Sequence, residues 1–191
     1  MNRVDVYGLA HKALRALLFE TAALAARTDF ADAGEAARLA ASADALLGWL
    51  DEHAEHEERQ IMPELAAIAP ELHAAVAADH GRVSSVQQEV RGWVARLRLA
   101  DGAARVAAGA RLHDRLLALT AEQLRHMASE EADANRALWA HRTDDELRSV
   151  LARIRAATPP ERGQAWLELL LPALSAPERA AVLAATREVT P

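Results

Sequence analysis

Apolar residues recur along the chain with the three- and four-residue spacing of a single helix face. The pattern first appears in residues 3–27, at Val4, Leu14, Leu17, Leu18 and Leu24. A polar stretch then interrupts it, in which Asp32 and Glu35 have the spacing of a helix N-cap and its capping-box partner. We expect a second helix from there to about Met62, where Pro63 should weaken or kink it.

The same periodicity continues through two more long segments. A third helix is expected to open at Pro70 and to end near residues 99–102, and a fourth to run from about Ala103 to about Trp139. Aromatic residues make up only 4% of the chain, and runs of strand-forming residues are missing. The sequence therefore predicts an all-α protein, an antiparallel up-down four-helix bundle.

The segment that follows the bundle has a different pattern of helix starts. Three capping boxes recur there, at Thr143 with Glu146, Thr158 with Glu161, and Ser175 with Glu178. They predict three short helices whose apolar residues must be buried. We therefore divide the chain into a bundle, 1–141, and a helical C-terminal extension, 142–191, which packs on the bundle or on a partner. A homodimer or a complex with another protein through these helices is the expected form of such a partnership.

Composition and charge narrow the classes of function. The chain has 191 residues, 51% of them hydrophobic and 26% charged, which is typical of a soluble globular protein. The absence of cysteine excludes disulfides, thiolate metal ligands and thiol nucleophiles. A net charge of −6 without a basic stripe argues against nucleic acid as a partner. The lack of a signal peptide or of a long apolar run argues against a membrane role, and we expect a cytoplasmic protein.

Two His-x-x-x-Glu pairs stand out among the polar residues. His53 and Glu57 lie four residues apart near the end of the second expected helix, so both point from the same face. His126 and Glu130 repeat the spacing in the fourth helix. A single pair of this kind is usually a weak surface interaction. Its repetition indicates a degenerate internal repeat of two helices.

The two pairs are expected to lie at the same depth along the bundle axis. His11 lies near the start of the first expected helix and His80 near the start of the third, whereas the two pairs lie near the ends of the second and fourth. In an antiparallel bundle these four ends lie at one level, so all six side chains can converge inside it. Four imidazoles and two carboxylates suffice for a pair of iron, manganese or zinc ions, with the carboxylates shared.

These features resemble the hemerythrin-like family, also called the HHE cation-binding domain. The resemblance covers residues 1 to about 140 and rests on His11, "HAEHEERQIMP" at 53–63, "DHGRV" at 79–83 and "HMASEE" at 126–131. It implies a four-helix bundle with a centre of two iron ions, for which zinc or manganese can substitute. Carried over by position, the implied metal ligands are His11, His53, Glu57, His80, His126 and Glu130. The implied ligand from solution is a diatomic molecule or peroxide.

The chain departs from the oxygen-carrying members of that family. Their third helix offers two histidines four apart, whereas here Val76 and Ser84 flank His80 at that distance, and the last carboxylate is Glu130 rather than an aspartate one residue later. The ligand set is thus more symmetric than a carrier requires. We expect turnover of peroxide or oxygen, or the handling or sensing of nitric oxide or iron. The sequence does not decide between an enzyme and a sensor.

Two other functions compete with this interpretation. In the first, the bundle holds a metal as a signal and the C-terminal helices pass its state to a partner. In the second, the protein is a metal-free scaffold whose histidines form a buried polar network, which would be a costly burial of ionisable groups.

Some neighbouring residues have open roles. Tyr7 and His56 are candidates for a seventh ligand, although packing is the favoured role for Tyr7, and contact with solvent or a neighbouring helix for His56. Trp49 is expected to pack as a lid or floor of the site. Glu58 and Glu131 directly follow the ligand carboxylates and should turn away into solvent.

Overall fold

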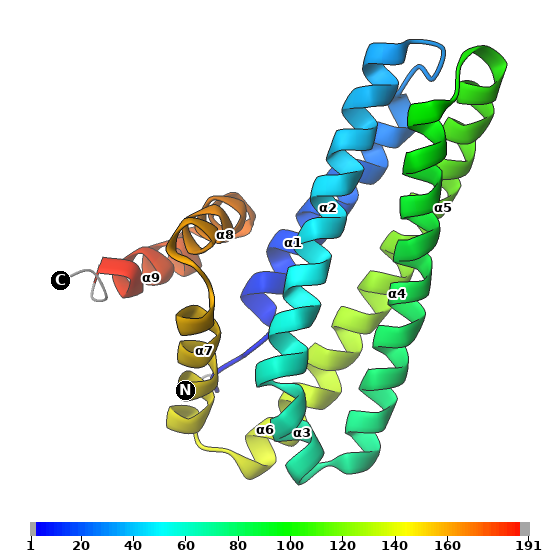
Figure 1. Cartoon of the computed structure of the whole chain (residues 1–191). Helices are drawn as coiled ribbons and strands as arrows, with labels where there is room; N and C mark the ends of the chain where they lie inside the picture. The colour runs from blue at the N-terminus through cyan, green and yellow to red at the C-terminus, as the bar shows by residue number, and fades with distance from the viewer. Residues whose placement is uncertain (1–2, 188–191) are drawn as a thin grey trace.

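Four long helices run up and down along one axis and form the body of the protein (Figure 1). The computed structural model describes residues 3–187, with side chains to residue 185, and contains no strand in that range. The bundle helices are α1 (Gly8–Arg27), α2 (Ala33–Gln60), α4 (Pro70–Leu99) and α5 (Gly102–Ser129). Each packs against two others in the cyclic order α1, α2, α4, α5. The prediction of an all-α up-down bundle is confirmed.

The helix boundaries follow local chemistry, with two departures from expectation. Helix α1 begins at Gly8 rather than at residue 3, because the Asp5 carboxylate accepts the N–H groups of Tyr7 and Gly8 and holds the preceding segment out of the helix. Asp32 caps α2 as expected, by accepting the N–H of Glu35. The Glu35 carboxylate, however, accepts from the N–H of Asp29, so only half of the predicted capping box forms.

The expected break near Pro63 divides two helices. Helix α2 ends at Gln60, and α3 (Met62–Ile68) starts with Pro63 in its first turn, where a proline nitrogen leaves no hydrogen bond unmade. Helix α4 then opens at Pro70 and ends at Leu99, as the pattern predicted. A short connection through Gly102, at φ 43°, turns the chain into α5.

The fourth expected helix is not uniform. Helix α5 ends at Ser129, a π-helical turn η1 spans Glu130–Ala134, and α6 (Asn135–His141) resumes the α-helix. A hydrogen bond from the N–H of Asn135 to the carbonyl of Glu130 closes this wider turn. Periodicity did not predict it. Such π turns in α-helices are rare and often mark functional sites.

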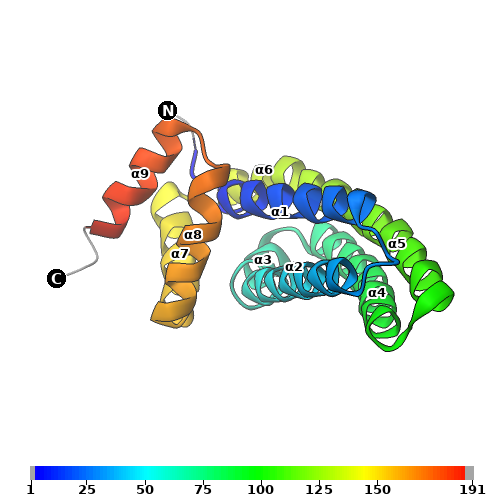
Figure 2. The ribbon, with the colours of Figure 1, turned by 90° about the horizontal axis from the view of Figure 1, so that it is seen from above.

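The C-terminal extension forms the three expected short helices, α7 (Asp144–Ala157), α8 (Pro160–Ala173) and α9 (Ala176–Arg187). They lie on one side of the bundle, opposite α4 and α5 (Figure 2). Helix α7 packs on α2, and α8 packs on α1. These contacts place the extension on the bundle, whereas its being a separate unit, and its binding of a partner, stay predictions.

Of the three predicted C-terminal capping boxes, one forms completely and one forms in part. Thr143 and Glu146 form a complete capping box, and the Glu178 carboxylate accepts from the N–H and hydroxyl of Ser175. The predicted capping box of Thr158 with Glu161 does not form. Thr158 ends α7 with its hydroxyl bonded to the Ile154 carbonyl, so Pro159 takes the N-cap position of α8 without a side-chain bond.

The bundle interior contains two apolar cores. We call the first the leucine core, and its main side chains are Leu14, Leu18, Leu39, Leu46, Leu47, Leu50, Val90, Leu112, Leu116 and Leu119. We call the second the end core, and it contains Val6, Tyr7, Ile61, Met62, Leu65, Val76, Ala134, Leu138, Leu147 and Val150. The six predicted site residues lie where the two cores meet: between them along α1, α2 and α4, and between Leu119 and Ala134 along α5 and η1. Among the described residues, no helix is long and apolar enough to cross a membrane.

Candidate metal centre

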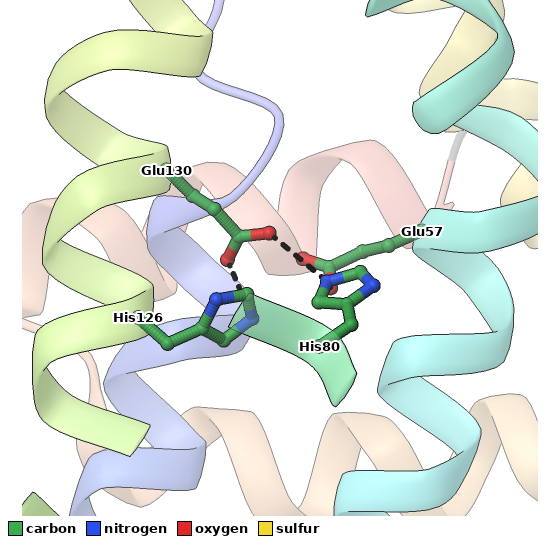
Figure 3. Close-up of side chains that lie close together, drawn as sticks. All are labelled: Glu57, His80, His126 and Glu130. Carbon is green, nitrogen blue, oxygen red and sulfur yellow. Dashed lines mark ion pairs between the residues drawn. The ribbon is translucent and has the colours of Figure 1, made fainter. Parts of the chain in front are cut away.

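The level between the two cores holds the six side chains that the sequence singled out. Five of them are buried, and His80 is nearly so, with 12% of its side chain exposed. In Figure 3 the carboxylates of Glu57 and Glu130 point toward each other from α2 and from η1, with His80 and His126 beside them. Two overlapping groups have atoms close enough to hold a metal ion: Glu57, His80, His126 and Glu130, and His11, His53 and Glu57.

The two oxygens of Glu57 face different histidines. Its Oε1 lies 3.1 Å from Nε2 of His53 and 3.5 Å from Nε2 of His11. Its Oε2 lies 3.5 Å from Nε2 of His80. The carboxylate thus spans the space between a pair of histidines on one side and a third histidine on the other.

Glu130 spans the same space from the opposite wall. Its Oε1 lies 3.4 Å from Nε2 of His80, while its Oε2 lies 3.3 Å from Nε2 of His126 and 3.5 Å from Nε2 of His11. Its four-residue spacing from His126 places this side chain on the inward face, and the π turn that begins at Glu130 keeps the next buried positions in line with it. Because a wider turn keeps residues four apart on one face, positions 126, 130, 134 and 138 are all buried.

Several polar atoms of the centre lack hydrogen-bond partners in the described part of the chain. They are both carboxylate oxygens of Glu57, both of Glu130, Nε2 of His80 and Nδ1 of His126. A buried polar atom without a partner costs about 1–3 kcal/mol. The Nε2 atoms of His11 and His53 face each other at 3.1 Å. Inward-facing nitrogens and carboxylate oxygens without protein partners are a donor set that a divalent or trivalent cation fits.

We expected Glu58 and Glu131 to turn into solvent, but each contacts the Nδ1 atom of a histidine of the centre, on the side of the ring away from the carboxylates of Glu57 and Glu130. Nδ1 of His80 lies 2.6 Å from Oε1 of Glu58, and Nδ1 of His11 lies 3.0 Å from Oε1 of Glu131, which also accepts from Arg15 at 2.8 Å. A proton on Nδ1 leaves Nε2 of each ring directed at the centre. The signal was present in the sequence, because both halves read His-x-x-x-Glu-Glu.

The same contacts raise the pKa values of two histidines. Burial has the largest effect on the His11 pKa and would lower it, but contacts with Glu131 and Glu57 outweigh burial and raise it to about 9. Burial likewise opposes the positive charge of His80, yet Glu130, Glu57 and Glu58 raise its pKa to about 11. The carboxylates around these two rings therefore favour their protonated forms when no metal is bound.

The other groups shift in ways that follow from the crowding of charge. Burial, together with the charge of Glu57, raises the pKa of Glu130 to about 7. Burial opposes ionisation of Glu57 too, but His53, His11 and His80 hold its pKa well below the ordinary value. Burial lowers the pKa of His126 to about 4. The centre therefore contains more ionisable groups than it can keep charged without a cation.

Three neighbours of the centre have roles apart from it. His56 lies on α2 against the C-terminal extension, with Nε2 3.3 Å from the Thr158 hydroxyl, which confirms contact with a neighbouring helix. The expectation that Trp49 forms a lid or floor of the site is wrong, because its ring packs edge-on against Trp166, 4.8 Å between centroids. Tyr7 is buried in the end core, with its ring 5.5 Å from that of His11.

Comparison with known proteins adds an independent observation. A family model described as the hemerythrin HHE cation binding domain matches residues 2–138. The chain belongs to this family. The matched range takes in all four bundle helices and every residue of the candidate centre, and it ends before the C-terminal extension. Neither the comparison with curated proteins nor that with solved structures found a match.

Membership in the HHE family and the geometry of the centre agree on a coarse function. The matched domain is a cation-binding domain. Its interior gathers histidine and glutamate groups whose atoms can hold a metal ion. The HHE bundle is thus the part of this protein that is built for a metal.

Proposed function

We propose that the HHE domain binds two iron ions side by side between its two cores. His11 and His53 would hold one ion and His80 and His126 the other, and the carboxylates of Glu57 and Glu130 would be shared. The observation that supports this proposal best is the division of the oxygens of Glu57, since Oε1 faces His11 and His53 and Oε2 faces His80. Zinc or manganese would find the same donors.

Iron in such a centre supplies a reversible change of oxidation state and open positions for oxygen, peroxide or nitric oxide. The residues of the chain supply the setting for that chemistry. Glu58 and Glu131 orient His80 and His11, and the leucine core and the end core exclude bulk water from the level of the centre. We infer that the protein handles or senses one of these small molecules, or iron itself.

The proposal is tested by metal analysis and an optical spectrum of protein purified in air. We expect about two irons per chain and a near-ultraviolet charge-transfer band, as imidazole and carboxylate ligands favour. The double variant His53→Ala, His126→Ala should lose both. His141→Ala is the matched control, because His141 is exposed and belongs to neither group that could hold a metal ion. Metal-free wild-type protein, or a metal content that the double variant leaves unchanged, would overturn the proposal.

A second candidate function, metal-dependent signalling through the extension, has one specific observation in its favour. The helix that carries His53 and Glu57 also carries Glu52, whose carboxylate accepts from Nε1 of Trp166 at 2.8 Å and pairs with Arg162. A shift of α2 on metal binding would therefore reach α8 directly. Tryptophan fluorescence that changes on metal binding, and that loses this change in Trp166→Phe, would favour this function.

Removing the carboxylate that orients His11 should weaken metal binding without abolishing it. In Glu131→Ala, the imidazole loses the acceptor of its Nδ1 proton, and losses of this kind typically cost 10–100-fold in metal affinity. Competition with a chromophoric chelator would measure the change. Glu131→Gln keeps an oxygen acceptor and should lie between the wild type and Glu131→Ala.

A matched control separates orientation from general charge removal. Glu122 has a similarly exposed side chain, 28% against 30% for Glu131, and pairs with an arginine, but it has no contact with a histidine of the centre. Glu122→Ala should therefore bind metal as the wild type does. Equal losses in Glu122→Ala and Glu131→Ala would show that His11 does not depend on its carboxylate partner.

A further inference from the structure

A cavity of about 400 Å³ lies between α2, α4 and α5, directly beside the candidate centre. At one end its wall consists of His53, Glu57, His80 and His126. Its volume is at the lower end of the range for pockets that bind small molecules. A ligand in the cavity would therefore reach the His80 and His126 side of the centre without entering the leucine core.

Two amide side chains form the wall of the cavity next to these histidines. Gln87 and Gln123 line it, and they are only 6% and 4% exposed. Gln87 follows His80 by two helical turns and Gln123 precedes His126 by one, so each shares the inward face of a histidine of the centre. In the described part of the chain, no other residue makes a hydrogen bond to either amide.

Packing alone does not account for amides at this level. The adjoining layer of the leucine core is filled by apolar side chains, Leu50 among them. The amide atoms of Gln87 and Gln123 make no hydrogen bond to another described residue, and they are open to the cavity rather than sealed in the packing. The amide groups are therefore placed to serve what occupies the cavity, whether ordered water or a ligand of the centre.

The exposed charged groups of the cavity wall have partners of opposite charge. Asp51 and Glu58 are exposed on its wall, and Glu57 lies at its inner end. Asp51 pairs with Arg91, and Glu58 contacts Nδ1 of His80, so the charges on the wall are balanced and favour neither a small anion nor a small cation. An amide offers both a donor and an acceptor, so it holds best a molecule that accepts and donates hydrogen bonds in turn.

We propose that this cavity binds a small uncharged molecule that both donates and accepts hydrogen bonds, of which hydrogen peroxide is the simplest, and that Gln87 and Gln123 select it. Nitric oxide and dioxygen, which cannot donate, gain little from the amides. The proposal rests on the proposed function for the metal at its inner end. It adds the class of ligand, the side of entry and the two residues that recognise the ligand.

The test follows the side-chain amide signals of the glutamines by NMR during a titration with hydrogen peroxide. It uses metal-free protein and protein loaded with zinc, which has no redox chemistry. Saturable shifts of Gln87 and Gln123 in either form, with Gln88 unmoved, are the expected result. Gln88 is the matched reference because it is the exposed neighbour of Gln87 on α4.

A variant gives the second measurement. In iron-loaded protein, Gln87→Leu with Gln123→Leu should bind peroxide about tenfold more weakly, as the loss of two modest hydrogen bonds implies, and should bind nitric oxide as the wild type does. The double variant should remain folded, which its melting temperature checks, and Gln88→Leu should behave as the wild type. Amide signals that peroxide leaves unmoved in both forms would overturn the proposal, as would unchanged peroxide affinity in a fully loaded double variant. Absence of metal from the wild type would instead refute the proposed function.

Discussion

Replacing Glu130 with glutamine is expected to lower metal content and, in the metal-free protein, to raise stability. In the loaded protein, the substitution removes a carboxylate whose two oxygens face His80 and His126, so the metal content should fall sharply. In the metal-free protein, the same carboxylate is buried beside Glu57 without hydrogen-bond partners for either oxygen among the described residues. A neutral amide of the same shape avoids that repulsion.

The pH dependence of the stability gain follows from the raised pKa of Glu130. In an unfolded chain the carboxyl loses its proton near its ordinary value of 4.5, whereas in the folded protein it keeps the proton up to a pH of about 7. Folding is therefore penalised progressively as the pH rises through this window, and the full penalty is present above it. Glu130→Gln should add ~1–3 kcal/mol to the free energy of unfolding at about pH 8 and little at about pH 4.5. Urea unfolding of chelated proteins at the two pH values measures both.

Glu131, the residue after Glu130, provides a control for which the expected change in stability has the opposite sign. Burial opposes ionisation of Glu131, but His11 and Arg15 lower its pKa to about 2. Its charged form therefore favours folding, and Glu131→Gln should reduce the stability of the metal-free protein at about pH 8. If Glu130→Gln instead destabilised the metal-free protein at that pH, the centre would be a polar network that holds the fold together, as in the scaffold alternative.

The meeting of six side chains could be predicted from the sequence because it depends on properties that are local or nearly so. The spacing of His53 to Glu57 and of His126 to Glu130 fixes a shared face on each helix. The antiparallel order of the helices then fixes the depth, which places His11 and His80 at the same level. Neither step requires knowledge of how neighbouring helices rotate against one another.

Features that depend on tertiary contacts could not be predicted in this way. The rule that the residue after an inward carboxylate points outward is correct for an isolated helix, but it ignores what another helix brings to that face. Glu131 meets His11 from α1, and Glu58 meets His80 from α4. The prediction that Trp49 forms a lid or floor of the site was wrong for the same reason, because its partner, Trp166, is more than a hundred residues away along the chain.

The π turn at Glu130 escaped prediction for a different physical reason. A helical pattern of apolar residues is recognised over three or four turns. One residue inserted into a turn shifts this pattern by less than the ordinary irregularity in the spacing of apolar residues. The wider turn keeps Ala134 and Leu138 on the same face as Glu130, so that these two residues continue into the end core.

Removal of the metals is expected to lower the melting temperature by ~10 °C or more. An ion that binds only the folded state stabilises it by about 4 kcal/mol when free metal exceeds the dissociation constant a thousandfold. For a chain of 191 residues, each kcal/mol corresponds to a shift of roughly 2–4 °C. Calorimetry of the loaded protein with and without a strong chelator measures the difference. His53→Ala with His126→Ala should melt at one temperature whether or not chelator is present.

The regions that lose stability when the metals are removed show where the metals are bound. Hydrogen exchange of the chelated protein should accelerate most around Glu57 and Glu130, where the carboxylates lose their only counter-ions apart from the histidines. It should accelerate least at the far end of the leucine core, around Leu39 and Leu112, which are fully buried among apolar side chains. A melting temperature that chelation leaves unchanged would mean that the buried charges balance one another without a cation. An acceleration spread evenly over the bundle would mean that the metals stabilise the fold from somewhere other than this centre.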